Sequence, residues 1–222
     1  MQTVLKAALV LGAVALYALP MIGDLGSRSI GVGKGDSKLY LWSLSWLPYA
    51  LTHGVSPFFT TRVFAPDGVD LTWVTTLPVP ALAMLPLTAL AGPIASANIL
   101  LLLAPPLAGW AMFLACREIT GRFLPSAFGG LVLACSTYVG QLMRAQLNLL
   151  LMFWFPLAIY LFLRHLHGRM SQRRFIVLLA AVLIGEFLTS TEVFAMMTFC
   201  SGIAWLIFYV AGDEALRERL LD

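Results

Sequence analysis

The chain alternates between long apolar segments and short polar connections. The first apolar segment is predicted as a helix over residues 3–22. Five more segments approach the roughly 20 residues that an α-helix needs to cross the hydrocarbon core of a bilayer. They are residues 94–117, 124–143, 147–166, 175–188 and 193–210. This pattern predicts an all-α polytopic membrane protein with about six transmembrane helices, built as a single module over residues 1–222.

Residues 23–93 separate the first two predicted spans and form a long external loop in this topology. Within it, residues 39–52 carry apolar side chains at helical spacing, with Trp42 and Trp46 one turn apart. Tryptophan prefers the headgroup level of a membrane, which favours a helix lying in the outer interface. Two interpretations of this helix stay open. It forms an aromatic belt that anchors the loop, or it forms one wall of a groove for a lipid-linked substrate.

Residues 76–92 are apolar but contain Pro78, Pro80 and Pro86. Proline inside a helix removes a hydrogen bond and clashes with the preceding turn, so a regular spanning helix is disfavoured here. The segment is predicted as an interfacial or re-entrant helix, a form that membrane proteins tolerate where it packs on protein.

The distribution of arginine among the loops predicts how the chain is oriented in the membrane. The connection 165–174 holds three arginines and is the most basic short loop, and such loops remain in the cytoplasm. Alternation along the chain then places 117–122 inside, with 144–148 and Asp36 outside. Both termini are predicted to be cytoplasmic.

Composition supports the membrane class. The chain is 60% hydrophobic and 11% charged, with a mean hydropathy of +0.88, which is too apolar for a soluble domain of this length. The net charge of +3 is modest, and the basic residues lie between apolar segments, so a nucleic-acid partner is excluded. The cysteine and histidine spacings match no common metal motif, so no metal site is predicted.

The best candidate for chemistry is Asp36, because it lies between the first span and the predicted interfacial helix. A carboxylate at this boundary can meet both water and a lipid-borne substrate. It can accept a proton from a hydroxyl group or help to hold a divalent cation. Arg62 and Arg144 are the candidate ligands for a phosphate, with contact to lipid headgroups as the alternative for Arg62.

Polar residues recur at the predicted outer ends of the later spans. Gln146 and Asn148 follow Arg144, and Glu192 lies in the turn between the last two spans. Contact with substrate is predicted for these residues. Glu186 lies about one turn inside the bilayer and needs a partner there. An ion pair with Arg144, a substrate contact and a proton relay remain open for it.

Short motifs follow one another in a fixed order: GVSPFF at 54–59, FAPDG at 64–68, TTLP at 75–78, REITG at 117–121 and QLNLL at 146–150. This order resembles the N-terminal half of large bacterial GT-C type integral-membrane glycosyltransferases, the group of protein mannosyltransferases and lipid A aminoarabinose transferases. The resemblance covers most of the chain, and its motifs are diffuse.

The resemblance implies an enzyme of the bacterial inner membrane that acts on the extracytoplasmic face. Its donor would be a sugar on a polyprenyl-phosphate carrier, and its partners would include membrane lipids. Asp36 matches the early acid that serves as catalytic base or orients the substrate. The resemblance identifies no cofactor, although it leaves room for a divalent cation at this acid.

The chain departs from that family in two respects. Many members carry two adjacent acids where this chain has Asp36 alone, and family members usually have more spans. The chain is therefore expected to be a fragment of a longer enzyme, a split half, or a truncated relative. The alternative function is a non-catalytic subunit that packs against other integral-membrane proteins. A transporter is disfavoured, because no span shows a dense polar stripe and inverted halves are not evident.

Overall fold

The structure, a computed structural model, describes residues 25–30 and 36–212 and is mainly helical. The predicted first span, residues 3–22, and both termini lie outside the described residues. In chain order the elements are α2 (Ser37–His53), β1 (Phe59–Thr60), β2 (Val69–Asp70), the 3₁₀-helix η2 (Leu71–Trp73), α3 (Pro78–Ala83), α4 (Leu85–Thr120), α5 (Phe123–Ala134), α6 (Thr137–Leu142), α7 (Leu147–Leu150), α8 (Trp154–Leu166), α9 (Gln172–Phe187) and α10 (Thr191–Ala211).

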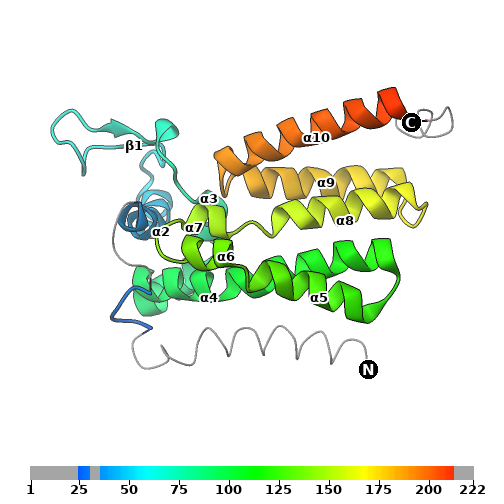
Figure 1. Ribbon diagram of the computed structural model, residues 1–222. Coiled ribbons are helices and arrows are strands. Elements are labelled where there is room, and N and C mark those ends of the chain that lie inside the picture. Colours follow the sequence, from blue (N-terminus) through cyan, green and yellow to red (C-terminus); the bar gives the residue numbers. More distant parts are fainter. Residues whose placement is uncertain (1–24, 31–35, 213–222) are drawn as a thin grey trace.

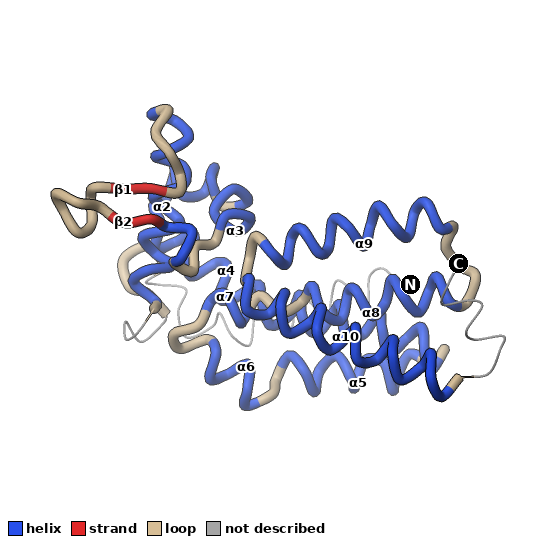
Figure 2. The backbone as a smooth tube through the Cα atoms, turned by 90° about the horizontal axis from the view of Figure 1, so that it is seen from above, coloured by secondary structure: helices blue, strands red, loops and turns tan. Residues whose placement is uncertain are grey.

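The longer helices α4, α5, α8, α9 and α10 run lengthwise along the molecule (Figure 1). Helices α2, α3, α6 and α7 and the antiparallel pair β1–β2 gather at one end, which we call the lobe end; the same gathering is visible from above in Figure 2. The opposite end, which we call the loop end, holds the connection from α4 to α5 and that from α8 to α9. The two ends are therefore built differently.

Four helical segments among the described residues are long and apolar enough to cross a membrane: Leu85–Thr120, Phe123–Leu142, Leu147–Leu166 and Thr191–Ala211. These segments contain or closely match four of the predicted spans. Helix α9 covers most of the predicted span 175–188, but it has only 16 residues, below the length that a spanning helix usually needs. A membrane protein is thus supported, and the count of six spans stays a prediction.

Two of the four segments are broken near the lobe end. The segment Phe123–Leu142 divides into α5 and α6 at Ser136, whose hydroxyl accepts a hydrogen bond from the Val139 N–H at 3.2 Å and so caps α6. The segment Leu147–Leu166 likewise divides into the short α7 and the longer α8. The breaks produce the short helices α6 and α7, which pack with α2 and α4 in one apolar core.

The prolines of residues 76–92 begin helices instead of interrupting one. Pro78 is in the first turn of α3 and Pro86 in the first turn of α4, where a missing N–H costs no helical hydrogen bond. Gly92, with φ 83° and ψ 170°, then kinks α4, a conformation that is readily available only to glycine. The segment is two helical pieces joined through α4 to a membrane-length helix, and its re-entrant character stays a prediction.

The tryptophans of α2 stack on each other, with ring centroids 5.4 Å apart. Trp46 is buried, and its indole N–H donates to the Pro57 carbonyl at 3.0 Å. Burial with a satisfied N–H is the behaviour of a core tryptophan. Trp46 therefore holds the lobe together, and it does not serve as the surface anchor that its spacing predicted.

Asn98 of α4 fixes the chain that precedes α2. Its side-chain amide donates to the carbonyl oxygens of Leu25 and Arg28, each at 2.7 Å, and its Oδ1 accepts the Ile30 N–H at 2.9 Å. Asn98 is fully buried. Three backbone groups distant in sequence are thus satisfied by one side chain, which positions the segment that leads to Asp36.

Helices α4 and α5 approach closely where glycines face each other. A Cβ placed on Gly130 would lie 2.5 Å from the Gly109 carbonyl oxygen, whereas one on Gly140 would meet nothing within 4 Å. We expect Gly130→Ala to destabilise the fold by about 1–3 kcal/mol through overpacking. Gly140→Ala should be neutral or stabilising by up to about 1 kcal/mol. Unfolding in detergent measures both, and equal stabilities for the two variants would contradict the close approach.

Candidate functional site

Asp36 is exposed at the start of α2, immediately before Ser37. Its main-chain carbonyl accepts the Tyr40 N–H at 3.1 Å, which begins the helix. Its carboxylate makes no capping hydrogen bond to the helix, although a negative charge is favoured at this terminus. The side chain is therefore held at a defined place and open to solvent.

Tyr40 connects Asp36 to the later helices. Its buried hydroxyl donates to the Asn148 Oδ1 of α7 at 2.6 Å. Burial, followed by the negative charges of Asp36 and Glu192, raises the pKa of Tyr40 to about 12. Both carboxylates therefore lie close enough to act on the same phenol. Asn148 thus contacts Tyr40 directly, and the charges of Asp36 and Glu192 act on the same phenol from two other parts of the chain.

A small cleft opens beside Tyr40 between α2, α4 and the connection from α6 to α7. Two further predicted residues, Arg144 and Gln146, lie in its wall and are exposed. Its other lining residues are Ser29, Ser37, Leu41, Ala97, Leu101, Met143, Ala145 and Leu147. The cleft is narrow, with a volume of about 20 Å³, and Arg144 and Gln146 contribute to its wall next to Tyr40.

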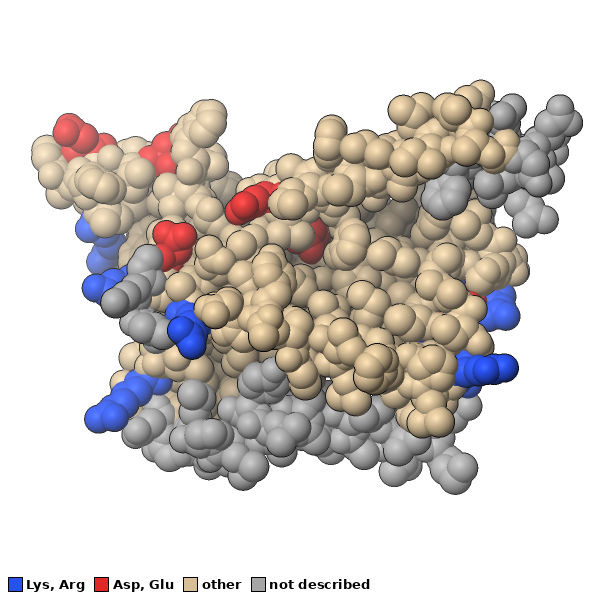
Figure 3. Space-filling model, in the orientation of Figure 1, with Lys and Arg blue, Asp and Glu red and all other residues tan. Residues whose placement is uncertain are grey.

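Charged side chains are gathered at the ends of the molecule. Figure 3 shows acidic and basic atoms near one another at the lobe end, while most of the surface over the long helices carries neither. This distribution suits helices surrounded by lipid with polar groups at the bilayer boundary. The cleft lies at that boundary.

Arg62 is not brought to the cleft. It lies in the loop between β1 and β2, donates to the Tyr49 hydroxyl, and places its guanidinium 4.4 Å from the Tyr49 ring centre. Tyr49 and Asp36 are separated by most of α2, or roughly 20 Å at 1.5 Å per residue. Arg62 is therefore held by an aromatic side chain in the lobe, away from Asp36, and its role as a phosphate ligand stays a prediction.

Glu186 near the end of α9 is 1% exposed, and neither carboxylate oxygen has a hydrogen-bond partner among the described residues. The expected ion pair with Arg144 is not formed, because Arg144 is exposed at the cleft. The Trp154 indole N–H is also buried without a partner in the described part of the chain. Glu186 lies beneath the turn that leads to Glu192, and it is separate from the cleft.

Tyr40 and Asn98 are the site residues that the sequence analysis missed. The helical spacing places Tyr40 at an apolar position of α2. Its hydroxyl group is the feature that indicates a buried polar contact. Asn98 is an amide within the apolar run 94–117, and a polar side chain inside a predicted span is such a signal.

No protein-family model, curated protein or solved structure matches this chain. The resemblance to GT-C glycosyltransferases consequently rests on the motifs alone. Among the described residues, no group of three or more histidine, cysteine, aspartate or glutamate side chains could hold a metal ion.

Titration of Tyr40 tests whether the two acids flank it. We expect Tyr40 to stay protonated above pH 10, where an ordinary tyrosine ionises. Because the unfolded chain loses this proton first, the stability contribution is complete below about pH 10 and is lost as the pH rises toward 12. Absorbance at 295 nm should show one late tyrosine that disappears in Tyr40→Phe. Asp36→Asn and Glu192→Gln should each lower its pKa, and an unchanged late titration in both would refute the arrangement.

Proposed function

We propose that this chain is a GT-C-like membrane glycosyltransferase module that takes a sugar from a polyprenyl-phosphate carrier at the lobe end. The observation that supports the proposal is that the charges of Asp36 and Glu192 both act on Tyr40, which lines a cleft together with Arg144. An exposed acid, a second acid and a cation at the ends of membrane-length helices suit a substrate with a lipid tail and a charged head.

The chemistry of a glycosyl transfer fits these groups. The acceptor hydroxyl oxygen forms a bond to C1 of the sugar, and the bond from C1 to the phosphate oxygen breaks. Asp36 takes the hydroxyl proton as general base. The polyprenyl phosphate leaves with the bonding electron pair, and Arg144 stabilises its charge. Gln146 and Glu192 would bind sugar hydroxyls, while Asn148 orients Tyr40.

The charges at the two ends support an extracytoplasmic site. Among the described residues, the loop end holds six arginines against one acid, whereas the lobe end holds four cations against five acids. The loop-end residues are Arg117, Arg122, Arg164, Arg169, Arg173, Arg174 and Glu118. Basic loops remain in the cytoplasm. We therefore propose an inner-membrane protein with its loop end inside and its cleft outside.

Direct assay tests the proposal. The purified protein in nanodiscs would be mixed with a panel of polyprenyl-phosphate sugars and hydroxyl acceptors, and the release of polyprenyl phosphate would be followed. Turnover that needs both donor and acceptor supports the transferase. Intact donor across the whole panel, together with a stoichiometric membrane protein that co-purifies, would favour a subunit instead.

A non-catalytic subunit is the second candidate, and α10 is the observation in its favour. Only 6% of the most apolar stretch of α10 is buried, against 61% for α4. A helix that exposes nearly every apolar side chain can pack against another membrane protein as readily as against lipid. Under this hypothesis the chain keeps a GT-C-like architecture and binds its partner in the membrane.

A further inference from the structure

Glu186, near the end of α9, is a buried acid that the proposed transfer reaction does not use. It is 1% exposed, and neither of its carboxylate oxygens has a hydrogen-bond partner among the described residues. A carboxylate that keeps its charge in such a place is strongly disfavoured unless a counter-charge or several hydrogen bonds compensate it. Glu186 therefore needs either a counter-charge or a proton.

The titratable side chains of α8 do not compensate Glu186. The Arg164 guanidinium donates to the Tyr160 hydroxyl at 2.8 Å, one turn back along the same helix. His165 stacks on Phe175, with ring centroids 4.4 Å apart, near the start of α9. Since Glu186 is at the other end of α9, the cationic groups of α8 lie toward the loop end and away from it.

The other helices beside Glu186 supply no counter-charge either. In α9 the cations are Arg173 and Arg174 of the first turn, roughly 20 Å from Glu186 at 1.5 Å per residue. Helix α10 begins with Glu192, which has the same sign as Glu186. Its remaining titratable groups are Cys200 and Tyr209, and α3 has none.

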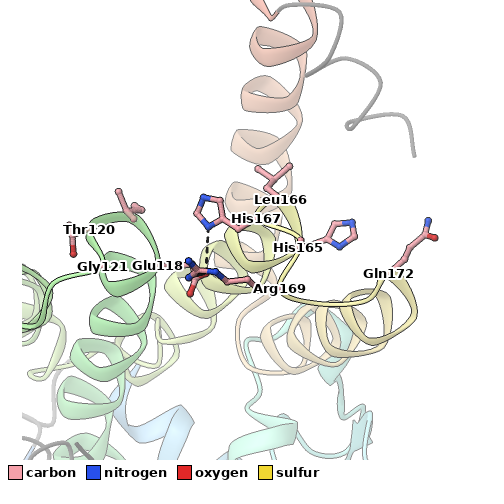
Figure 4. A pocket seen from close by; sticks show the side chains of 10 residues that line it. Glu118, Thr120, Gly121, His165, Leu166, His167, Arg169 and Gln172 are labelled. Atoms are coloured by element: carbon pink, nitrogen blue, oxygen red, sulfur yellow. Dashed lines mark hydrogen bonds and ion pairs between the residues drawn. The ribbon is translucent and has the colours of Figure 1, made fainter.

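The charges of the connection between α8 and α9 are paired at the loop end. Figure 4 shows them beside the cavity there, where the Arg169 Nη1 donates to the Glu118 carboxylate at 2.7 Å. The His167 Nδ1 lies 3.5 Å from the same carboxylate. No charged group of the described residues acts on Glu186, so a proton is the species that can neutralise it.

A second unsatisfied group lies beside the acid. The Trp154 ring of α8 packs on Gly185, the residue before Glu186, where an added Cβ would lie 2.6 Å from a ring carbon. The Trp154 indole N–H is buried and has no partner in the described part of the chain. A buried donor and a buried acid in adjacent positions are the groups that an internal water molecule joins.

Glu186 also holds the turn between α9 and α10. Its main-chain carbonyl accepts the N–H groups of Thr189 and Ser190, at 2.9 and 2.7 Å. Thr189 and Ser190 are each 1% exposed, and the Leu188 carbonyl accepts the Val79 N–H of α3 at 3.2 Å. A charge on the Glu186 side chain could therefore reach water only if this turn moved.

We propose that Glu186 is a proton-binding site: its carboxyl group is protonated while α9 and α10 are packed as described, and it releases the proton to water when the turn between them opens. The neutral acid is compatible with burial, and a water molecule can join it to the Trp154 N–H. Because the turn leads into Glu192, the proton on Glu186 controls the approach of Glu192 to Tyr40. The inference does not depend on sugar transfer, so a failed transferase assay would leave it intact.

Infrared spectroscopy of the protein in nanodiscs tests the protonation of Glu186. At mildly acidic pH we expect the C=O stretch of a buried carboxylic acid, which is missing from Glu186→Gln and kept in Glu192→Gln, the matched exposed acid. Trp154→Phe should shift this band, because it removes the neighbouring N–H, and an unshifted band would remove Trp154 from the site. The absence of the band from the parent protein, or its survival in Glu186→Gln, would overturn the proposal.

Hydrogen exchange measures the coupling to the turn. At alkaline pH, the amides of residues 188–193 should exchange roughly tenfold or more faster in the parent than in Glu186→Gln, because glutamine stays neutral where the buried acid ionises. At mildly acidic pH the two proteins should exchange alike. Comparison at one pH removes the intrinsic pH dependence of exchange. Equal exchange in both proteins at every pH would refute the coupling.

The parent protein provides a test that needs no variant to fold. Its carboxylic-acid band should disappear over the same pH interval in which exchange of the turn becomes faster. A band that persists after the turn has opened, or a turn that stays protected after the band is lost, would contradict the proposal. Replacing sodium by potassium should change neither measurement. If the band appeared only when sodium was removed, a cation and not a proton would occupy the site.

Discussion

Asp36→Asn is expected to lower sugar transfer by about 10²- to 10⁴-fold, the range that a general base contributes. Asparagine keeps the size of the side chain but cannot accept the hydroxyl proton. Because the Asp36 side chain makes no capping hydrogen bond, its replacement should leave the stability of α2 nearly unchanged. The measurement is the release of polyprenyl phosphate under saturating donor, with thermal unfolding of the same sample beside it.

Two variants make this result specific. Asp67→Asn removes an exposed acid from the loop between β1 and β2 and should retain full transfer. Glu192→Gln should weaken binding of the donor more than the rate at saturation, because Glu192 is assigned to sugar contact. Full activity in Asp36→Asn would show that Asp36 is not the general base. If only Glu192→Gln lost turnover, Glu192 at the start of α10 would take that assignment.

Asn98→Leu should produce the largest loss of stability. Leucine keeps the branched skeleton of the asparagine side chain but cannot make its hydrogen bonds to the Leu25 and Arg28 carbonyls and the Ile30 N–H. The three lost bonds are partly buried and each contributes about 0.5–1.5 kcal/mol net, so a total of about 3 kcal/mol is expected. Denaturant unfolding in micelles measures the free energy. Proteolysis near Ile30 should also become faster, because the segment is no longer held against α4.

Ser126→Ala is the matched control. Ser126 is fully buried as well, but its hydroxyl donates to the Arg122 carbonyl at 2.6 Å, a few residues away in the chain. We expect a loss below about 1 kcal/mol. If both variants were equally stable, the long-range bonds of Asn98 would not be what fixes the segment before α2.

The helical spans followed from the sequence because lipid imposes a simple rule: each must be apolar and of membrane length. Residues 94–117 and 193–210 obeyed it and lie within single helices, whereas 124–143 and 147–166 are each divided between two helices. Residues 76–92 did not follow this rule. Their prolines lie where α3 and α4 begin, and hydropathy alone does not show the boundaries of helices.

The candidate site was predictable where it depends on neighbours in the chain. Arg144 and Gln146 share one short connection and necessarily emerge together. Their meeting with α2 depends on the packing of Tyr40 against Asn148, and the approach of Glu192 depends on where α10 begins. Arg62 shows the opposite case, because its place in the loop between β1 and β2, against the Tyr49 ring, could not be predicted from neighbours in the chain. These positions depend on contacts between residues that are distant in the sequence, and residue spacing alone does not predict such contacts.

The surplus of arginine at the loop end has a consequence for how the protein is made. Moving one elementary charge across a membrane against a potential of 100 mV takes about 2.3 kcal/mol. Counting the described residues alone, an inverted molecule would have to export the six loop-end arginines with one acid, whereas the proposed orientation exports four cations with five acids. We therefore expect the membrane potential to favour insertion in the proposed orientation over the inverted one. Collapsing the potential with an uncoupler should raise the share of inverted molecules.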